Sequence, residues 1–546
     1  MKIVLIETSA NQKYIFSTNK LRENIGASEL TNRIGTKVVL DAVGRNYNYE
    51  NDKSGEKLKS ILNNEKPIEK SSEEDGVEII IATSGKAILL TKSKKKAEQI
   101  IRNVTQTALK EMPGLKVNGA IADVSDDLKT IHSAIGEVHR KLDESRYQVP
   151  SNEQRFLRLP FVAPCASSGL PAQKYDSNEK EQIPRFSKVS LKKRAVSDNG
   201  KSRLEKTIGT YSENFYFAGD VNSLEKLFDE LSWLSIIHAD GNGLGQIFLE
   251  FDKHTGLREG RISPREHLNI YRKFSIALDL CTLDAVGFAL KNLQGWTQNN
   301  LKEKKKESIE IPIIPLILGG DDLTVICDGE YALKFTKDFL KKFRENTQAE
   351  GIIKEIVGEE GLGICAGIAI VKPHYPFHQA YKLSEQLLKS AKKIKEEGDS
   401  KDTALDFHVL YDSAGANLKE IRNKFKDFDV ASPYVIDSGF ETDWLKNRDF
   451  QELEKRVNAI RNKKDGKKTL PNSQLHKIRE MLFVGTEETK AFANTIKHRY
   501  ETFSQLEPLF LEENDTKLTH FLGSITISEF WKGFEDNDGA KNENDE

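Results

Sequence analysis

The chain has 546 residues, of which 38% are hydrophobic and 30% are charged, and its formal net charge is −2. This length is too great for one compact core and predicts about two to four domains. The near-neutral charge excludes a protein that binds nucleic acid by bulk electrostatic attraction alone. Local basic patches remain compatible with this net charge. No apolar stretch approaches the ~18–20 residues of a membrane-spanning helix, so no membrane partner is expected.

The first seven residues, MKIVLIE, reach an acidic side chain too early to form the apolar core of a signal peptide. The four cysteines lie far apart, and Cys281, Cys327 and Cys365 stand inside apolar runs. These are expected to be reduced core thiols of a cytoplasmic protein. Cys165 has no cysteine neighbour, whereas a zinc site needs about four clustered ligands, so no zinc is expected.

In chain order, the first part of the sequence predicts a strand, a helix, a hairpin, a helix and a strand. Residues 1–16 predict a strand that enters a turn, and residues 21–44 have helical spacing. A charged piece at about 49–75 is expected to be a loop or insertion. VEIIIATSGKAILLT (77–91) predicts two strands around a turn, and an amphipathic helix separates it from the strand LKVNGAIADV (115–124).

The same order recurs further along the chain. WLSIIHADGNGLGQIF (233–248) predicts a strand that enters a turn. Ser263-Pro264-Arg265-Glu266 predicts the start of a long helix, with a capping serine and a capping-box glutamate. IPIIPLILGGDDLTVICDG (311–329) predicts a hairpin, and GLGICAGIAIV (361–371) predicts a strand between two helices. This recurrence indicates an internal duplication.

We therefore predict an α+β protein with two ferredoxin-like βαββαβ units, an architecture called a palm, and a C-terminal helical domain. Aligning the first strands places Thr8 with Asp240, and aligning the hairpins places Ser84–Lys86 near Gly320–Asp322. The second copy thus has acids where the first has Thr, Gly and Lys. The predicted boundaries are 1–125 for a degenerate first palm, 126–225 for a linker or helical insert, 226–412 for a catalytic second palm with the sequence GGDD, 413–510 for the helical domain and 511–546 for an acidic, partly disordered tail.

Three carboxylates are expected to meet at one end of the second sheet. Gly319 and Gly320 give the backbone freedom for a tight hairpin that presents Asp321 and Asp322. Asp240 ends the strand that lies beside this hairpin in a ferredoxin-like sheet. Such a cluster repels itself unless a hard divalent cation, Mg²⁺ or Mn²⁺, binds it. Two such ions lower the pKa of an attacking hydroxyl and stabilise a pyrophosphate leaving group.

Small residues and lysines around the acids are candidates for phosphate contacts. The turn formed by Gly241, Asn242 and Gly243 would let backbone N–H groups approach a triphosphate at the start of the next helix. On the last palm helix, one of Lys389, Lys392 and Lys393 could reach phosphate oxygens. A solvated helix face explains these lysines equally well.

Simpler interpretations stay open for each acid taken alone. Asp240 on its own would most often be a turn aspartate, and GGDD on its own is compatible with an ordinary hairpin turn. Their occurrence at matching places of one βαββαβ unit favours a site over both. His238, two residues before Asp240, is better explained as a hydrogen-bonded core histidine than as a base.

Together, HADGNGLGQIF, ILGGDDLTVI and GICAGIAIVKPHYPFHQAYKLSEQLLKSAK resemble the second palm domain of the large, polymerase-like subunit of type III CRISPR effector complexes. They are similar, more distantly, to diguanylate and adenylate cyclases. IETSANQKYIFSTNKLRENIGASEL and IIIATSGKAILL look like the degenerate first palm of the same family. The resemblance covers roughly residues 1–125 and 226–412.

The resemblance implies a Mg²⁺-dependent nucleotidyltransferase that joins ATP into cyclic oligonucleotide second messengers for antiviral signalling. It implies Asp321, Asp322 and Asp240 as catalytic and metal-binding residues. It also implies a turn at Gly319 and Gly320. Lys392 matches the lysine of the family's AK pair in the last palm helix. ATP would lie between the two palms, and other subunits of a defence complex would be partners.

The sequence also departs from this family. An N-terminal His-Asp nuclease domain is missing, and the cysteine zinc ribbon between the palms is reduced to Cys165 in APCASSGLPAQ. The chain therefore looks like a stand-alone relative, with RNA as a partner left open. Two alternatives remain: a templated, polymerase-like enzyme, and a non-catalytic nucleotide-binding scaffold subunit.

Overall fold

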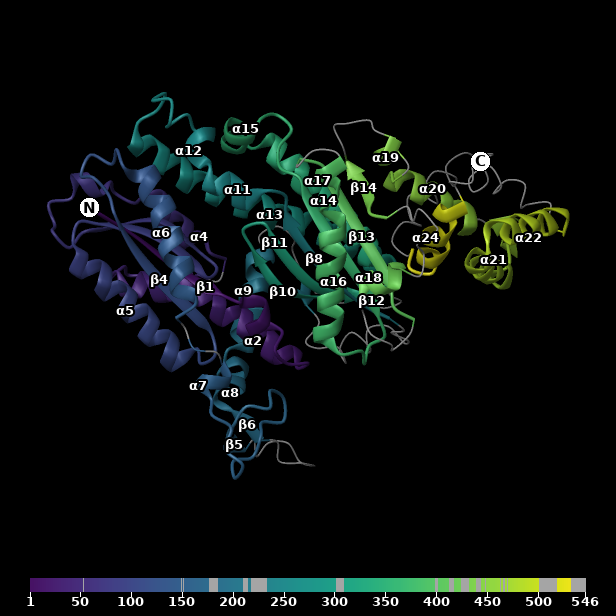
Figure 1. Cartoon of the computed structure of the whole chain (residues 1–546), viewed down its shortest axis with the longest axis horizontal. Coiled ribbons are helices and arrows are strands. Elements are labelled where there is room, and N and C mark those ends of the chain that lie inside the picture. The colour runs from purple at the N-terminus through teal and green to yellow at the C-terminus, as the bar shows by residue number, and fades with distance from the viewer. Residues whose placement is uncertain are drawn as a thin grey trace.

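The structure is a computed structural model that describes residues 1–52, 54–148, 150, 152–175, 185–209, 215–217, 233–300, 309–397, 401–411, 417–423, 432–437, 443–446, 448–461, 463–464, 467–468, 470–499 and 518–531. Its described part is elongated, with the N-terminal unit at one end and C-terminal helices at the other (Figure 1). The prediction of a mixed α+β protein is confirmed.

An antiparallel sheet with the strand order β2–β3–β1–β4 forms the first unit. Its strands are β1 (Lys2–Ser9), β2 (Val77–Thr83), β3 (Lys86–Thr91) and β4 (Lys116–Asp123). Successive side chains of β1 point to opposite faces, so Val4 and Ile6 enter one apolar cluster while Ile3 and Leu5 enter another. Both faces of this sheet are therefore covered.

Helices pack on both faces of the first sheet. The helices α2 (Leu21–Arg33) and α5 (Lys94–Glu111) share the cluster of Val4 and Ile6, and α6 (Ile131–Arg146) covers the other face. The shorter elements are α1 (Asn11–Ile15), η1 (Ile34–Val38), α3 (Val39–Ala42), η2 (Tyr49–Asn51), α4 (Glu56–Asn63) and η3 (Ile68–Lys70).

The described part of the segment between the two sheets is partly helical. It contains α7 (Asn152–Arg155), β5 (Ala172–Tyr175), β6 (Arg185–Ser187), α8 (Lys188–Ala195), α9 (Ser197–Gly209) and β7 (Phe215–Phe217). The β5–β6 hairpin and α8 project below the first unit in Figure 1.

A six-stranded sheet with the order β10–β11–β8–β12–β13–β14 forms the second unit. Its strands are β8 (Leu234–Gly241), β10 (Ile313–Gly319), β11 (Asp322–Asp328), β12 (Ile364–Val371), β13 (Thr403–Val409) and β14 (Tyr434–Asp437). The pair β12–β13 is parallel, and the other neighbours are antiparallel. The short β9 (Ile309–Ile311) pairs with β7 outside this sheet.

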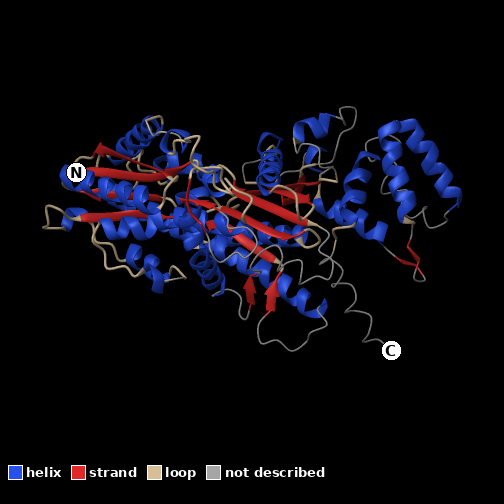
Figure 2. Ribbon diagram, turned by 90° about the horizontal axis from the view of Figure 1, so that it is seen from below, coloured by secondary structure: helices blue, strands red, loops and turns tan. Residues whose placement is uncertain are grey.

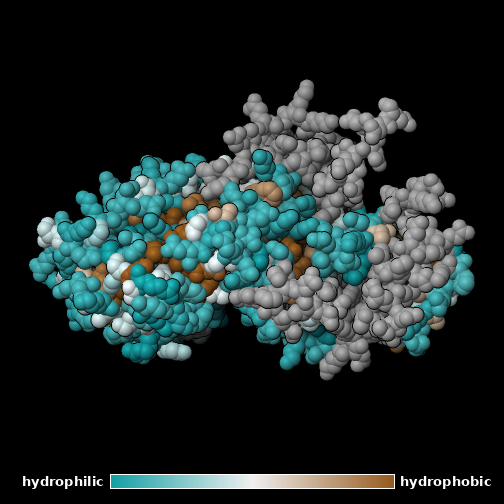
Figure 3. Space-filling view, turned by 90° about the horizontal axis from the view of Figure 1, so that it is seen from above, coloured by the Kyte–Doolittle hydropathy of each residue, from teal (hydrophilic) through white to brown (hydrophobic). Residues whose placement is uncertain are grey.

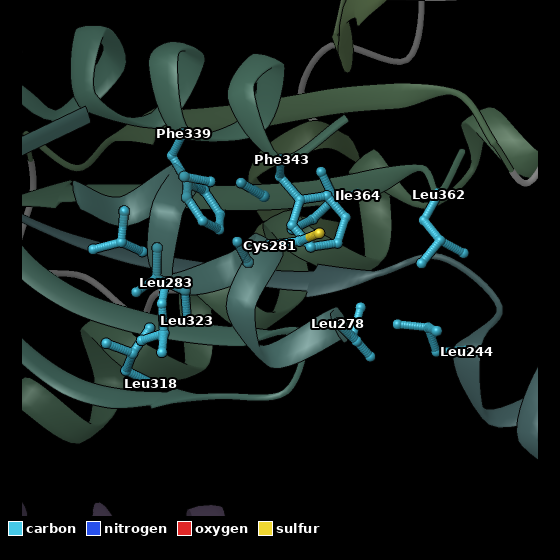
Figure 4. Close-up of a cluster of buried hydrophobic side chains, with 14 of the residues drawn as sticks. Leu244, Leu278, Cys281, Leu283, Leu318, Leu323, Phe339, Phe343, Leu362 and Ile364 are labelled. Atoms are coloured by element: carbon cyan, nitrogen blue, oxygen red, sulfur yellow. The ribbon is translucent and has the colours of Figure 1, made fainter. Parts of the chain in front are cut away.

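Helices also cover both faces of the second sheet. The long α13 (Pro264–Asn300) and α14 (Ala332–Ala349) cover one face, and α16 (Phe377–Ala391) covers the other. Phe339 and Phe343 of α14 pack against Cys281 of α13 and against sheet residues such as Leu323 (Figure 4). Shorter helices are α11 (Leu244–Leu249), α12 (Phe251–His254), α15 (Gly351–Val357) and α17 (Ile394–Glu397).

The two sheets share one topology. The order β10–β11–β8–β12 repeats β2–β3–β1–β4, and in both units a helix follows the first strand, another follows the hairpin and a third follows the fourth strand. The start of α13 also follows the sequence pattern, because the Ser263 hydroxyl accepts the Glu266 N–H at 3.2 Å. The ribbon view shows the two sets of strands in succession along the molecule (Figure 2).

The structure adds three details to the sequence-based expectations. The charged piece at 49–75 contains α4, whose Leu58 and Leu62 are buried because they pack in the first unit's core. The second sheet continues past residue 412, because β14 is its edge strand. The expected tail at 511–546 contains the helix α24 (Leu518–Ser528) and the buried Trp531, while 511–517 and 532–546 lie outside the described residues.

The remaining C-terminal elements are α18 (Leu418–Asn423), α19 (Asp443–Lys446), α20 (Phe450–Arg461), β15 (Lys463–Lys464), β16 (Lys467–Lys468), α21 (Asn472–Val484) and α22 (Thr486–Arg499).

All four cysteines are buried, and none forms a disulfide. Among the described helices, none combines the length and the hydropathy needed to cross a bilayer. The face in Figure 3 is mainly hydrophilic, with hydrophobic groups in a narrow band near its middle.

The contact between α16 and the second sheet depends on Gly367 of β12. A Cβ atom at Gly367 would lie 2.1 Å from the Ser384 carbonyl oxygen and 2.3 Å from the Leu388 nitrogen, both in the backbone of α16. Gly367→Ala should therefore lower the free energy of unfolding by ~1–3 kcal/mol, measured by chemical denaturation. The control Gly136→Ala adds a methyl to open space on α6 and should not destabilise. Equal effects would contradict this packing.

Candidate functional site

Strand pairing brings the three predicted acids to one end of the second sheet. The pairs Leu323–Ala239 and Gly319–Asp322 place the β10–β11 hairpin tip directly beside the end of β8. Asp240 follows Ala239, and Asp322 precedes Leu323, so these two carboxylates belong to adjacent strand positions. Asp321 lies in the two-residue turn rather than in a strand.

The hairpin tip is fixed by a helix that the sequence motifs did not include. Gly320 has φ +62°, a left-handed value that favours glycine at this turn position. Its N–H donates to Asp279 Oδ1 at 3.2 Å, and the Thr282 hydroxyl donates to its carbonyl oxygen. Asp279 also pairs with Lys59 at 2.9 Å. Only the i, i+3 spacing of Asp279 and Thr282 on α13 could have suggested this role.

The three carboxylates differ in their hydrogen-bond partners. Asp321 Oδ2 accepts the Gly241 N–H at 3.1 Å, so it lies next to the residue that follows Asp240. The Lys392 ammonium donates to Asp240 Oδ2 and, at 3.1 Å, to the Gly241 carbonyl oxygen. Asp322 Oδ1 is buried and has no hydrogen-bond partner. The site thus holds one carboxylate oxygen with no donor.

Burial and like charge shift the titration of the hairpin acids. Burial, followed by the charges of Asp240 and Asp322, raises the pKa of Asp321 well above its usual range. Burial and the Asp240 charge raise the pKa of Asp322 to about 8, and the Lys392 charge opposes this rise. The cluster is therefore held together against its own repulsion, and it favours a bound proton or cation.

His238 lies beneath the acids as a structural residue. Its ring is buried, and Nδ1 is 3.0 Å from the Thr324 hydroxyl and 3.5 Å from Asp322 Oδ1. Its ring centroid lies 5.4 Å from that of Tyr381 on α16. Burial lowers the pKa of His238, so the ring is neutral at physiological pH. This agrees with a hydrogen-bonded core histidine.

The turn after Asp240 differs from the expectation at Asn242. The Asn242 N–H donates to the Gly363 carbonyl oxygen at 2.8 Å, and its side-chain amide donates to the Asp402 carbonyl oxygen at 2.8 Å. Asn242 therefore points into the protein and does not offer these donors to a nucleotide. Gly243 has φ +72° and starts α11, which has only six residues. A phosphate site based on this short helix is not supported.

Of the three candidate lysines, Lys392 lies at the acids. Lys389 and Lys393 are exposed on the surface, whereas Lys392 is partly buried against Asp240. Lys392 follows the last turn of α16. The packing of α16 on β12 thus sets the position of its ammonium group.

A cavity of about 230 Å³ separates the two units at this point. Gly319, Gly320 and Asp321 line it from the second hairpin, and Gly85 and Lys86 line it from the first. A Cβ at Gly319 would lie 3.6 Å from the Cβ of Ser84, so the hairpin tips approach each other. Asp321, one of the three acids, therefore faces the first unit across this cavity.

The equivalence of the two units is offset by one residue from the sequence alignment. Glu7 pairs with Lys86 at the start of β3, as Asp240 lies beside Asp322 at the start of β11. Glu7 also binds Arg146, the last residue of α6, at 3.2 Å. Lys392 binds Asp240 from the corresponding helix end. Glu7, and not Thr8, therefore corresponds to Asp240.

The side chains at this site fit a hard divalent cation chemically. Three carboxylates with one undonated oxygen are the oxygen ligands that Mg²⁺ and Mn²⁺ prefer. In the described ranges, however, no three His, Cys, Asp or Glu side chains are close enough to enclose an ion. At this site, Asp240 is paired with Lys392.

Comparisons with known proteins agree with this architecture. Residues 233–403 match the family described as Cas10/Cmr2, second palm domain. No curated protein matches the chain significantly. Among solved structures, Csm1 from T. onnurineus matches with a TM-score of 0.52 and 13% identity, over 97% of this chain and 69% of that chain.

Two structures of a Csm1–Csm4 cassette are similar to the same extent. The complex with cA4 has a TM-score of 0.51 and 13% identity, over 97% of this chain and 69% of that chain. The complex with one ATP has a TM-score of 0.52 and 13% identity, over 97% and 70%. At this identity the likeness establishes a shared fold.

The raised pKa of Asp322 predicts a pH-dependent stability. Because the folded pKa of about 8 exceeds the ordinary value near 4, ionisation destabilises the fold, and stability should fall as pH rises from about 4 to about 8. Asp322→Asn removes this loss, so in EDTA its Tm should equal that of the wild type near pH 4 and exceed it by a few degrees near pH 8. Partial exposure of Asp322 keeps the effect small.

Thermal unfolding across this range measures the difference, and Glu98→Gln, at an exposed position of α5, is the control. A Tm difference that stays constant with pH would contradict the assignment.

Proposed function

Because this is a Cas10-like palm-domain protein, we propose that it is a nucleotidyltransferase that joins ATP, or other nucleoside triphosphates, into cyclic oligonucleotides. The observation that carries this proposal is that Asp240, Asp321 and Asp322 meet at one end of the second sheet, where Asp321 lines a cavity between two palm-like units. Solved structures of the same fold contain ATP in one case and cA4 in another, which supports the choice of substrate and product.

Asp240, Asp321 and Asp322 would hold Mg²⁺ or Mn²⁺. Such an ion, when bound, lowers the pKa of an attacking hydroxyl and offsets the charge of departing pyrophosphate. The undonated Asp322 oxygen supports this role, since a buried carboxylate oxygen without a donor is costly to the fold.

The other residues of the site position the hairpin acids and neutralise the charge of Asp240. Lys392 neutralises Asp240 in the resting protein, and its flexible ammonium can turn to phosphate oxygens once a cation takes that carboxylate. Asp279 and Thr282 keep Gly319 and Gly320 in the turn that presents the hairpin acids. Gly241 contributes its N–H to Asp321. These contacts fix the acids before substrate arrives, which lowers the cost of reorganisation.

We place this activity in antiviral defence, in the cytoplasm, with other effector subunits as partners. The support is the Cas10/Cmr2 family match and the presence of Csm4 beside Csm1 in the similar structures. A templated polymerase and a non-catalytic scaffold subunit are the outcomes that the following assay separates from this proposal.

Purified protein incubated with labelled nucleoside triphosphates, Mg²⁺ and, in a parallel sample, RNA should yield small cyclic or short linear products, separated by chromatography. Asp321→Asn and Asp322→Asn should each reduce turnover by at least about 100-fold, because each removes a charged ligand. Lys392→Ala should reduce it by about 10- to 100-fold. Lys389→Ala, on the exposed side of the same helix, is the matched control and should retain full turnover.

Long, template-dependent products would contradict this proposal and show that the protein is a templated polymerase. Absence of any product under all conditions, with nucleotide still bound, would favour the scaffold. Full turnover in the Asp321→Asn, Asp322→Asn double variant would contradict the assignment of these acids to the active site.

Divalent cations should stabilise the wild-type protein independently of catalysis. Mg²⁺ or Mn²⁺ at saturation should raise Tm by a few degrees, because binding to the folded state alone shifts the unfolding equilibrium. In the Asp321→Asn, Asp322→Asn double variant this rise should disappear, whereas Glu98→Gln should retain it. Calorimetric titration with Mn²⁺ gives the stoichiometry. An equal rise in the double variant would place the cation elsewhere.

A further inference from the structure

The segment between the two sheets contains two short sequences with the same spacing. Cys165 and Ser168 are separated by two residues, and so are Ser187 and Ser190. Two pairs with this spacing are typical of structural zinc sites when all four residues are cysteines. Here three of the four positions carry a hydroxyl group.

The fold brings these four side chains to one point. The distances are 3.5 Å for Cys165 Sγ to Ser190 Oγ, 3.2 Å for Ser168 Oγ to Ser187 Oγ, 3.2 Å for Ser187 Oγ to Ser190 Oγ and 3.5 Å for Ser190 Oγ to Ser168 Oγ. A fifth hydroxyl, that of Ser167, lies 3.4 Å from Cys165 Sγ and 3.1 Å from Ser190 Oγ. The groups form one closed hydrogen-bond network.

The backbone around this network is folded tightly as a knuckle. Gly169, directly after Ser168, has φ +65°, and its N–H donates to the Cys165 carbonyl oxygen at 3.0 Å. The Cys165 N–H donates to the Leu170 carbonyl oxygen at 2.7 Å, which closes the turn. The Ala166 N–H donates to the Arg185 carbonyl oxygen at 2.9 Å and joins the first pair to the second.

The chemistry of these groups does not fit a zinc ion. Structural zinc is bound by thiolate, imidazole or carboxylate groups, and a neutral serine hydroxyl is not among them. Tetrahedral ligands with ~2.3 Å metal–sulfur bonds lie roughly 3.8 Å apart, whereas the groups here lie 3.1–3.5 Å apart. The network is therefore contracted to the spacing of direct hydrogen bonds.

We propose that Cys165, Ser168, Ser187 and Ser190 form a metal-free knuckle, in which mutual hydrogen bonds take the structural place of a four-ligand zinc ion. The proposal explains why serine side chains are buried together at these positions. Ser187 and Ser190 are nearly inaccessible, and buried hydroxyl groups are tolerated because they satisfy one another.

The knuckle joins the start of α8 to the preceding segment, and α8 in turn packs on the first unit. Ser187 caps α8, since its hydroxyl accepts the Ser190 N–H at 3.2 Å. Further along α8, the buried Lys193 donates to the Tyr14 carbonyl oxygen at 2.6 Å and to the Ser17 hydroxyl at 2.9 Å. A Cβ at Gly26 of α2 would lie 1.8 Å from the Lys193 carbonyl oxygen, so the two helices touch. The network thus holds the inserted segment without a metal.

Restoring thiols tests the geometry directly. The variant with Ser168→Cys, Ser187→Cys and Ser190→Cys should bind one Zn²⁺ per chain, and its Co²⁺ form should show the visible absorption of tetrahedral thiolate ligation. The matched control adds Cys165→Ala to the same background and should bind Zn²⁺ at least about tenfold more weakly. The wild-type protein, dialysed against Zn²⁺ and then buffer, should retain no zinc by mass spectrometry.

A second measurement does not depend on the thiol variant folding. Ser190→Ala removes one hydrogen-bond partner from each of Cys165, Ser167, Ser168 and Ser187, so limited proteolysis should cut residues 163–175 and 185–195 several-fold faster than in the wild type. Ser133→Ala, at an exposed position of α6, should not change the rate. One retained zinc in the wild type, equal zinc binding by the variant and its control, or equal cleavage of Ser190→Ala and Ser133→Ala would each overturn the proposal.

Discussion

Mutual repulsion among three carboxylates at one sheet end is the constraint on which the second unit depends. Asp321 and Asp322 stay together because the hairpin tip is held from outside the sheet, by Asp279 and Thr282 on α13. Asp240 is held from the opposite face, through Lys392 at the end of α16. Two helices on opposite faces are therefore needed to keep the acids in one place, and the close packing of α16 on Gly367 serves the site as well as the core.

The two units have the same frame with different charges. Each has an acid at the end of its first strand that is bound by a cation from the helix after its fourth strand: Glu7 with Arg146, and Asp240 with Lys392. The hairpins differ, because Lys86 stands at the place of Asp322. Both hairpin tips line one cavity, with Asp321 on one wall and Lys86 beside Glu7 on the other.

The sequence predicted the parts of this arrangement that depend on local pattern. Alternating apolar residues predicted the strands, Ser263 predicted the start of α13, and GGDD predicted the turn that presents Asp321 and Asp322. It did not predict the role of Asp279, because the i, i+3 spacing of Asp279 and Thr282 does not by itself show which turn they contact. Thr8 was aligned with Asp240, one residue away from the true equivalent Glu7, because the sequence of a strand end does not show its register. The ion pair of Glu7 with Arg146 does show it. Asn242 was misassigned because small polar residues suit both a ligand turn and a buried amide.

The acid cluster and the serine knuckle show how the charge of a side chain decides whether a site needs an ion. Carboxylates can only accept hydrogen bonds when ionised, so a group of them lacks donors and retains an unsatisfied oxygen at Asp322. Hydroxyl groups both donate and accept, so Ser168, Ser187 and Ser190 satisfy one another and close around no ion. A network of hydroxyl groups therefore closes through its own hydrogen bonds, whereas the three carboxylates cannot satisfy one another in this way. The chain thus combines a metal-free support with a site whose electrostatics favour a cation.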